Sequence, residues 1–215
     1  MTSWPWTCAA VIAAALGAPA LAQPAGAAAP SFDCAKAGSA AEKLVCSDPR
    51  LAAMDRETAR LYRLASTDPK LPAGQLAQLK GAQRGWIKGR DDCWKDDDQR
   101  GCVVSSYAQR VHELRQASKA ARAVVPAAGS TGPLPYHCDG LDGLIGVTFL
   151  NVGGGAAYLQ WKDRGIGMTQ ASGAPGAHYA GKSFDGAWGF SPKGKTAQLI
   201  RPAGPVLACT EEPMG

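Results

Sequence analysis

The first candidate binding group in this sequence is the ammonium of Lys193, which is followed directly by Gly194. Two aromatic residues alternate with small ones before it, and an alternating run over 196–200 follows it. Such alternation around Gly and Pro is typical of a β-hairpin, and we expect its turn at 191–194, where Pro fixes φ and Gly tolerates positive φ. This turn would present one lysine to another molecule. The alternative is a lysine that only keeps a turn solvated, because exposed lysines are common there.

The three histidines do not form a catalytic pattern. His112, His137 and His178 are spread along the chain, and no G-x-S-x-G or paired His–Cys signature accompanies them. His178 precedes Tyr179 on a predicted contact loop, and His112 lies on a predicted helix as a surface or boundary residue. We therefore expect no catalytic residues and no enzyme.

No metal or cofactor site is predicted either. The cysteines include no C-x-x-C pair, which argues against zinc. The acidic residues Asp91, Asp92 and 96–98 lack the oxygen spacing and distal Glu of a calcium loop, so we interpret them as a solvated loop.

Six cysteines remain once Cys8, inside the predicted signal segment, is set aside. An even number in a small exported chain indicates disulfides, and six cysteines allow fifteen connectivities. Local spacing favours two short-range pairs in the first half and one pair joining the ends of the second. The predicted pairs are Cys34–Cys46, Cys93–Cys102 and Cys138–Cys209.

Residues 1–22 are predicted to be a secretory signal peptide. The apolar run 8–21 ends in Ala20-Leu21-Ala22, so cleavage is expected after Ala22, although 1–7 carry no Lys or Arg. Residues 23–30 form an Ala/Pro/Gly spacer that we expect to be disordered. No lipobox-like sequence precedes a cysteine. We expect a periplasmic or secreted protein with no stable membrane insertion.

The basic excess belongs to the first half of the chain. The whole chain carries a formal charge of +5; residues 31–125 hold 17 Lys and Arg against 12 Asp and Glu, and 126–215 hold 6 against 6. Because the charges are interleaved, a solvated helical surface is favoured over a nucleic-acid-binding stripe.

The first half reads as a helical domain over 31–120. Ser39 and Glu42 form a capping box, and Asp48-Pro49 starts a second helix. Two further helices are expected at 74–92 and 102–121. The residues expected to face inward are Leu51, Met54, Thr58, Leu61 and Ala65 on the second helix, Leu76, Leu79, Trp86 and Ile87 on the third, and Val103, Tyr107, Val111 and Leu114 on the fourth.

An Ala/Gly/Ser/Pro segment over 121–134 is predicted to be a flexible linker. Beyond it the helical period disappears and Gly becomes frequent. Seven or eight short antiparallel strands in 135–215 indicate a small barrel or sandwich.

Nearly all of 31–117 resembles the LprI-type domain, a four-cysteine exported helical module named after a mycobacterial lysozyme inhibitor. The resemblance rests on cysteines, Trp and Arg-Asp falling in order. The matching pieces are Phe32-Asp33-Cys34, Glu42-x-x-x-Cys46, Leu51-x-x-Met54-Asp55, Leu61-Tyr62, Gln83-x-x-Trp86-Ile87, Arg90-Asp91-x-Cys93, Cys102 and Tyr107.

Residues 135–210 resemble the MliC/PliC family, periplasmic inhibitors of c-type lysozyme with an eight-stranded barrel. The matching pieces are Tyr136-x-Cys138-Asp139-Gly140, Thr148-Phe149, Gly176-Ala177-x-Tyr179, Phe190-x-x-Lys193-Gly194, Ala197 and Cys209. Together the two resemblances imply α + β in separate domains: a disulfide-stapled helical domain, then a small antiparallel eight-stranded β-barrel.

The MliC resemblance also implies a binding site. In that family a Ser just before Gly-Ala-x-Tyr and the Lys of the Lys-Gly turn contact the two catalytic carboxylates of lysozyme. Lys193 matches the lysine, but Pro175 stands at the serine position. Either Ser172-Gly173 supplies the hydroxyl through a shifted loop, or that contact is missing. The implied lysozyme-binding residues are Lys193, Ser172, Gly173, Gly176, His178, Tyr179 and Gly194.

The expected function is therefore inhibition of lysozyme, c-type by resemblance, with barrel loops blocking the active-site cleft. The alternative is a cell-wall or polyanion-binding module that uses the basic helical half. Because c-type lysozymes are usually cationic, the chain's positive charge would not steer their association.

Overall fold

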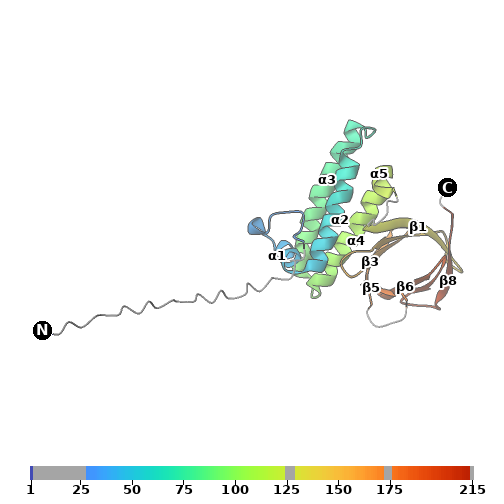
Figure 1. The fold of residues 1–215 in the computed structure, drawn as a ribbon. Coiled ribbons are helices and arrows are strands. Elements are labelled where there is room, and N and C mark those ends of the chain that lie inside the picture. The colour runs from blue at the N-terminus through green and yellow to red at the C-terminus, as the bar shows by residue number, and fades with distance from the viewer. Residues whose placement is uncertain (2–27, 124–128, 172–175, 214–215) are drawn as a thin grey trace.

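The computed structural model describes residues 1, 28–123, 129–171 and 176–213, which form a helical module followed by a β-barrel (Figure 1). The helical module contains the 3₁₀ turns η1 (Cys34–Lys36) and η2 (Asp92–Lys95) and the helices α1 (Ala40–Ser47), α2 (Pro49–Ser66), α3 (Ala73–Asp91), α4 (Gln99–Ala117) and α5 (Lys119–Arg122). The barrel strands are β1 (Ser130–Cys138), β2 (Ile145–Leu150), β3 (Ala156–Trp161), β4 (Arg164–Gln170), β5 (Tyr179–Ser183), β6 (Gly186–Lys193), β7 (Thr196–Ile200) and β8 (Leu207–Glu211). The predicted signal segment and most of the spacer lie outside the described residues.

Local signals set where the first two helices begin. The Ser39 side chain accepts from the backbone N–H of Glu42, whose carboxylate accepts from the backbone N–H of Ser39, which completes the predicted capping box. Asp48 caps α2 in the same way, and Pro49 occupies its first turn. The two helices therefore start where the sequence predicts.

The inward-facing residues predicted for α2 and α4 are buried, but α3 differs. Ile87 is 37% exposed, so its predicted inward orientation is wrong. The buried residue near the end of α3 is Arg90, whose guanidinium donates to the Tyr107 hydroxyl at 3.1 Å and to Asp91. Trp86 packs edge-on against Tyr107, with 5.4 Å between ring centroids, as core packing predicts. At the end of α3 the buried side chain is thus the charged Arg90 and not the predicted apolar Ile87.

The eight strands form a closed antiparallel barrel in sequence order, with β1 beside β8. Cys138 and Cys209 are directly opposite each other on this closing seam and form a disulfide. The helical module has the two local disulfides, Cys34–Cys46 and Cys93–Cys102. The predicted eight-stranded barrel and disulfide-stapled helical module are both present.

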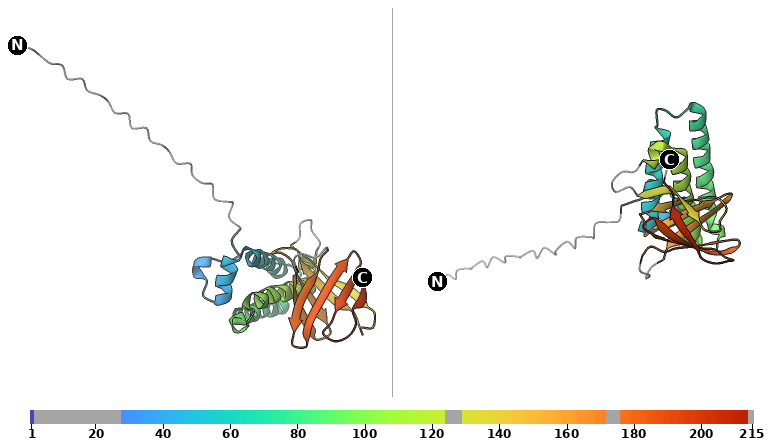
Figure 2. Two further views of the ribbon diagram at one scale, coloured as in Figure 1. Left: turned by 90° about the horizontal axis from the view of Figure 1, so that it is seen from below. Right: turned by 90° about the vertical axis from the view of Figure 1, so that its right-hand side faces the viewer.

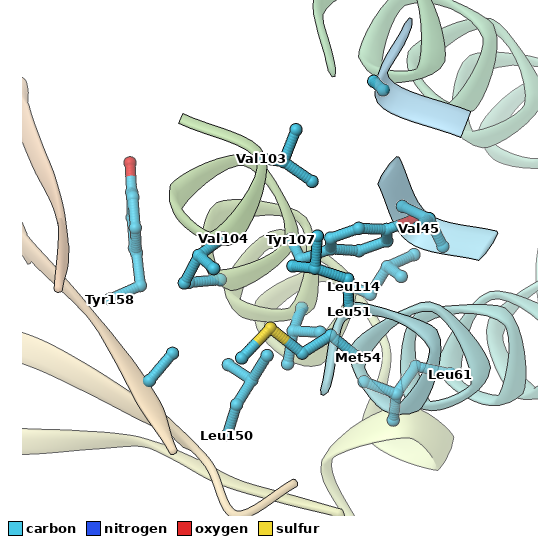
Figure 3. Packing of buried hydrophobic residues seen from close by; sticks show 14 of the residues in the cluster. Val45, Leu51, Met54, Leu61, Val103, Val104, Tyr107, Leu114, Leu150 and Tyr158 are labelled. Atoms are coloured by element: carbon cyan, nitrogen blue, oxygen red, sulfur yellow. The ribbon is translucent and has the colours of Figure 1, made fainter. Parts of the chain in front are cut away.

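Helix α4 joins the two modules. One hydrophobic cluster contains the helical residues and also Leu150, Ala156 and Tyr158 from β2 and β3. Figure 3 shows Leu150 and Tyr158 on the barrel strands facing Met54 and Val104. The modules are consecutive in the chain but share part of their core.

Buried polar groups reinforce this boundary. The guanidinium of Arg115, 1% exposed, donates to the carbonyl of Gly132 at 2.5 Å and to that of Ala121 at 3.0 Å. Ser130 at the start of β1 donates to the carboxylate of Glu57 on α2 at 2.5 Å. Strand β1 thus begins inside the predicted linker 121–134, and its first residues are held by α2 and α4.

The predicted surface or boundary position of His112 is wrong. It is 2% exposed, with its Nδ1 2.9 Å from the Thr148 hydroxyl and its ring 5.0 Å from that of Tyr158. The barrel residues that cover it, Thr148 and Tyr158, lie more than thirty positions later in the chain, so no local sequence signal indicates its burial. Burial lowers the pKa of this imidazole to about 4, against a smaller opposing effect of Glu113.

The helices lie on one side of the barrel, and β8 with the C-terminal end lies on the other side (Figures 1 and 2). Among the described residues no helix is both long enough and apolar enough to cross a bilayer.

Candidate functional site

The β6–β7 hairpin presents Lys193 at its tip. Lys193 pairs with Thr196 as the last register pair of the two strands, so the connecting turn is Gly194-Lys195. Gly194 has φ of 60°, a value suited to Gly at the first central position of a two-residue hairpin turn. The turn predicted at 191–194 is therefore displaced: Pro192 lies within β6, opposite Ala197. Lys193 still occupies the tip.

The Lys193 side chain is exposed, while its backbone is held firmly. The Thr196 hydroxyl donates to the Lys193 carbonyl at 3.0 Å, and the backbone N–H of Glu211 donates to the Lys195 carbonyl at 2.7 Å. Across 28–123, 129–171 and 176–213, no carboxylate forms an ion pair with Lys193. The tip thus offers an ammonium on a stiff support.

The described ends of the β4–β5 connection, 171 and 176–178, lie beside this hairpin, since β5 pairs with β6 and β6 with β7. The backbone N–H of Ala171 donates to the carbonyl of His178 at 2.7 Å, which closes the base of the connection. Gly176 is exposed with φ of 89°. Ser172 and Gly173, predicted to contact lysozyme, and Pro175 lie outside the described residues.

His178 contacts β6 through its side chain. Its Nδ1 lies 2.7 Å from the Ser191 hydroxyl oxygen, and both residues are half-buried. Tyr179 pairs with Phe190 in an antiparallel register. The residue before Tyr179, His178, and the residue after Phe190, Ser191, therefore lie opposite each other. The register thus brings an imidazole and a hydroxyl together two residues from Lys193.

Tyr179 faces the interior. It is 7% exposed, and its ring lies 5.4 Å from that of Phe149 within the barrel core. Burial raises the pKa of its hydroxyl above the ordinary value. Its place is to anchor the start of β5 behind the surface residues.

The sequence analysis did not identify Ser191, nor the polar residues that lie beside Lys193 on the neighbouring strands. Residues that are paired across neighbouring strands share a face, and Lys193 is followed across the sheet by exposed Thr196, Thr210 and His137. The two-residue alternation of a strand would have placed Ser191 beside Lys193 on this outer face. The row is a polar band across β6, β7, β8 and β1.

A second concave region lies between the modules. This groove, of about 1090 Å³, is bounded by α3, η2 and α4 on one side and by β4 and β5 on the other. Its wall is largely small residues, with exposed Phe184 and Lys182 on the barrel side and Asp97 on the helical side. It is formed jointly by two modules and is distinct from the Lys193 hairpin.

In the part of the chain that the structure describes, no cluster of three or more His, Cys, Asp or Glu side chains could hold a metal ion. The β6–β7 hairpin offers one exposed ammonium with polar side chains beside it.

Two family models match the chain. Residues 34–123 match LprI, described as lysozyme inhibitor LprI, and residues 136–206 match MliC, described as membrane-bound lysozyme-inhibitor of c-type lysozyme. No curated protein matches the chain. Residues 34–123 and 136–206 thus match, in this order, two families that are described as lysozyme inhibitors.

Proposed function

We propose that this chain, an LprI region followed by an MliC barrel, is an exported inhibitor of c-type lysozyme that inserts its Lys193 hairpin into the active-site cleft. The observation that carries the proposal is the exposed Lys193 ammonium at the tip of a stiff two-residue turn, in the region that matches MliC. The chain acts as a binding protein and not as an enzyme.

The chemistry of the target suits such a group. A retaining glycosidase of the lysozyme kind holds two carboxyl groups about 5 Å apart, one protonated and one ionised. An ammonium placed there pairs with the ionised carboxylate, and the hairpin behind it excludes the glycan. Inhibition then requires no covalent step.

The helical module leaves this end accessible. Its barrel contacts are made by α2, α4 and α5 with strands β1–β4, whereas Lys193 is the last residue of β6. His178 and Gly176 precede β5, next to the same hairpin, so they form the flank of the proposed contact. Tyr179 supports them from inside the barrel.

Removing the ammonium tests the proposal. We expect Lys193→Ala to raise the inhibition constant against a c-type lysozyme by a factor of tens or more, because loss of one partner of a desolvated charge pair costs about 2–5 kcal/mol. The measurement is lysis of a bacterial cell suspension by the lysozyme, titrated with full-length protein.

Lys182→Ala is the matched control. Lys182 is also an exposed lysine of the barrel, but it pairs with Ala187 toward the opposite end of β5. This variant removes the same charge and should inhibit as the wild type does. Equal inhibition constants for wild type and Lys193→Ala would overturn the proposed insertion.

The same protein preparation separates inhibition from cell-wall binding. Capture on lysozyme-coated resin but not on purified peptidoglycan is expected. Capture on peptidoglycan alone, with full lysozyme activity remaining, would instead favour a cell-wall-binding module and contradict the proposed inhibitor.

A further inference from the structure

The groove between the helical module and the barrel has an acidic helical wall. Its lining carboxylates are those of the three consecutive aspartates 96–98, which precede α4, and of Glu113 on α4. Across 28–123, 129–171 and 176–213, none of these aspartates forms an ion pair. Of the two lining cations, Arg90 is buried and bonded to Asp91, and Lys182 lies on the barrel wall. The groove is therefore locally negative in a chain whose formal charge is +5.

A buried hydroxyl in this groove has no partner within the protein. Tyr158 lines the groove and is 7% exposed, and in the described part of the chain no residue forms a hydrogen bond with its hydroxyl. Figure 3 shows this oxygen directed away from Leu150. A Cβ added to Gly165, which also lines the groove, would collide with it. The hydroxyl thus lies at the groove wall.

This hydroxyl is a donor that a bound ligand could use. Burial, with a smaller effect of Glu113, raises the pKa of Tyr158 to about 12, so the hydroxyl keeps its proton at neutral pH. A buried polar group without a hydrogen bond is unfavourable. A ligand that places an acceptor such as a backbone carbonyl in the groove would satisfy it.

The groove opens onto the outer face of the barrel from which Lys193 projects. Its barrel wall includes Thr169 and Ala180, which pair across β4 and β5, and Ala180 pairs with Gly189 on β6. Paired residues share a face of the sheet and every second residue returns to it, so Gly189 and Lys193 belong to this same face. Lys193 is four residues beyond Gly189, which places its Cα about 14 Å from that of Ala180.

One partner molecule can cover both places. An interface of standard size buries about 800 Å² on each protein, which is a patch about 30 Å across. We infer that the groove is a second docking site for the lysozyme and takes a lysine- or arginine-bearing segment of the enzyme's surface while Lys193 occupies its cleft. This inference rests on the proposed function and adds the helical module to the interface.

The chemistry of the groove favours this occupant. Because c-type lysozymes are usually cationic and this chain is basic, contact over most of the helical surface is repulsive. The aspartates 96–98 supply opposite charge where a lysine or arginine of the enzyme would enter, and such side chains form charge-assisted hydrogen bonds with carboxylates. Phe184, 89% exposed at the rim, adds aromatic contact area of the kind that protein interfaces use.

Removal of the unpartnered hydroxyl is the first test. Tyr158→Phe keeps the ring beside His112 and breaks no hydrogen bond of the free protein, so the full-length variant should unfold at the wild-type temperature. We expect it to bind a c-type lysozyme about 3- to 10-fold more weakly in titration calorimetry. Tyr62→Phe, which removes the hydroxyl of a half-buried tyrosine on α2 outside the groove, should bind as the wild type does. Unchanged affinity of Tyr158→Phe would contradict the inference.

Neutralising the helical wall is the second test. The full-length double variant Asp96→Asn/Asp97→Asn removes two charges and leaves Asp98, which caps α4, in place. We expect its association with lysozyme, followed by stopped-flow fluorescence, to be about 3- to 10-fold slower than that of the wild type at about 20 mM salt. The difference should shrink to less than about twofold at about 500 mM salt, where exposed charges are screened.

Asp139→Asn/Asp163→Asn is the matched control. It removes the same charge from two exposed residues in connections at the opposite end of the barrel from Lys193. Its association rate should stay within about twofold of the wild-type rate at both salt concentrations. Equal slowing of the two double variants would mean that net charge, and not the groove, determines the rate, and would overturn the inference.

These outcomes separate the inference from the proposed function. If the wild-type protein neither binds nor inhibits lysozyme, the proposed function fails. If Lys193→Ala weakens inhibition while the groove variants bind as the wild type does, the proposed function stands and only the inference about the groove fails. If the groove variants weaken binding and Lys193→Ala does not, the groove is a lysozyme contact and the insertion of Lys193 is wrong.

Discussion

Single residues at the module boundary carry an unusual amount of buried polarity. His112 and Arg115 lie on the same face of α4, three residues apart, and both bond to barrel groups. Because both are nearly inaccessible, the hydrogen bonds of both residues and the protonation of His112 are coupled to folding. The boundary should therefore respond to pH in a way that an apolar contact would not.

The pKa of His112, lowered to about 4 by burial, predicts a defined loss of stability in mild acid. The unfolded imidazole, with an ordinary pKa near 6.5, binds a proton between about pH 6.5 and 4 while the folded one does not, so the free energy of unfolding decreases as pH falls through this window. From pH 7 to 4.5 we expect a loss of about 2–3 kcal/mol from this group.

Urea unfolding of wild type and His112→Gln at several pH values measures this effect. The variant lacks the titrating ring, so its stability should change less over the same range, even though its absolute stability is lower. Parallel pH profiles for the two proteins would show that His112 does not titrate on unfolding.

At the scale of elements, α4 is the helix that organises the molecule. It carries two parallel stripes, one offset from the other by a residue along the helix. The stripe at 103, 107, 111 and 114 belongs to the helical core, and the stripe at 104, 108, 112 and 115 is also buried, with its last two residues on the barrel. A helix buried on both sides fixes the orientation of the barrel relative to α2.

Close backbone contact between α4 and β4 predicts the effect of one methyl group. A Cβ added to Gly167 would lie 2.7 Å from the Ser105 Cα and 2.4 Å from its hydroxyl oxygen, so the helix would have to move. We expect Gly167→Ala to lower the free energy of unfolding by about 1–3 kcal/mol, as overpacking does.

Gly146 provides the comparison, because it is also a strand glycine near α4. A Cβ there would meet His112 at 3.6 Å and Pro133 at 3.7 Å, which is ordinary contact. Gly146→Ala should change stability by less than about 0.5 kcal/mol. Chemical denaturation of both variants checks the pair, and equal effects would mean that close packing of α4 on β4 is not the cause.

At the scale of the whole molecule, the shared cluster predicts one unfolding unit. Leu150, Ala156 and Tyr158 would be exposed on an isolated barrel, and Ser130 would lose its hydrogen bond to Glu57. We expect the full-length protein to unfold in a single calorimetric transition whose calorimetric and van't Hoff enthalpies agree. Two resolved transitions would show that the modules are energetically independent.

The sequence predicted what is locally encoded. The capping box at Ser39, the Asp48-Pro49 helix start, the hairpin around Gly194 and the three disulfides all depend on residues close in the chain or on family resemblance. The buried state of His112 and Arg115 depends on a barrel face contributed by residues much later in the chain. The second buried stripe of α4 includes the polar residues His112 and Arg115, so apolar periodicity does not predict that it is buried.

The candidate site divides in the same way. Lys193 was predicted at a hairpin tip because alternation and Gly are local signals. The contact between His178 and Ser191 depends on the register of β5 with β6, which the sequence leaves open. The serine contact that the MliC resemblance implies falls at Ser172 or is lost at Pro175, and both residues lie outside the described ones.

The disulfide between Cys138 and Cys209 has a further consequence for the lysine-bearing hairpin. It lies on a seam with three register pairs, and β8 on this seam also pairs with β7, the second arm of that hairpin. While the two thiols are reduced, backbone hydrogen bonds and core packing hold this seam without a covalent link. We therefore expect thiol oxidation to make the support behind Lys193 more rigid.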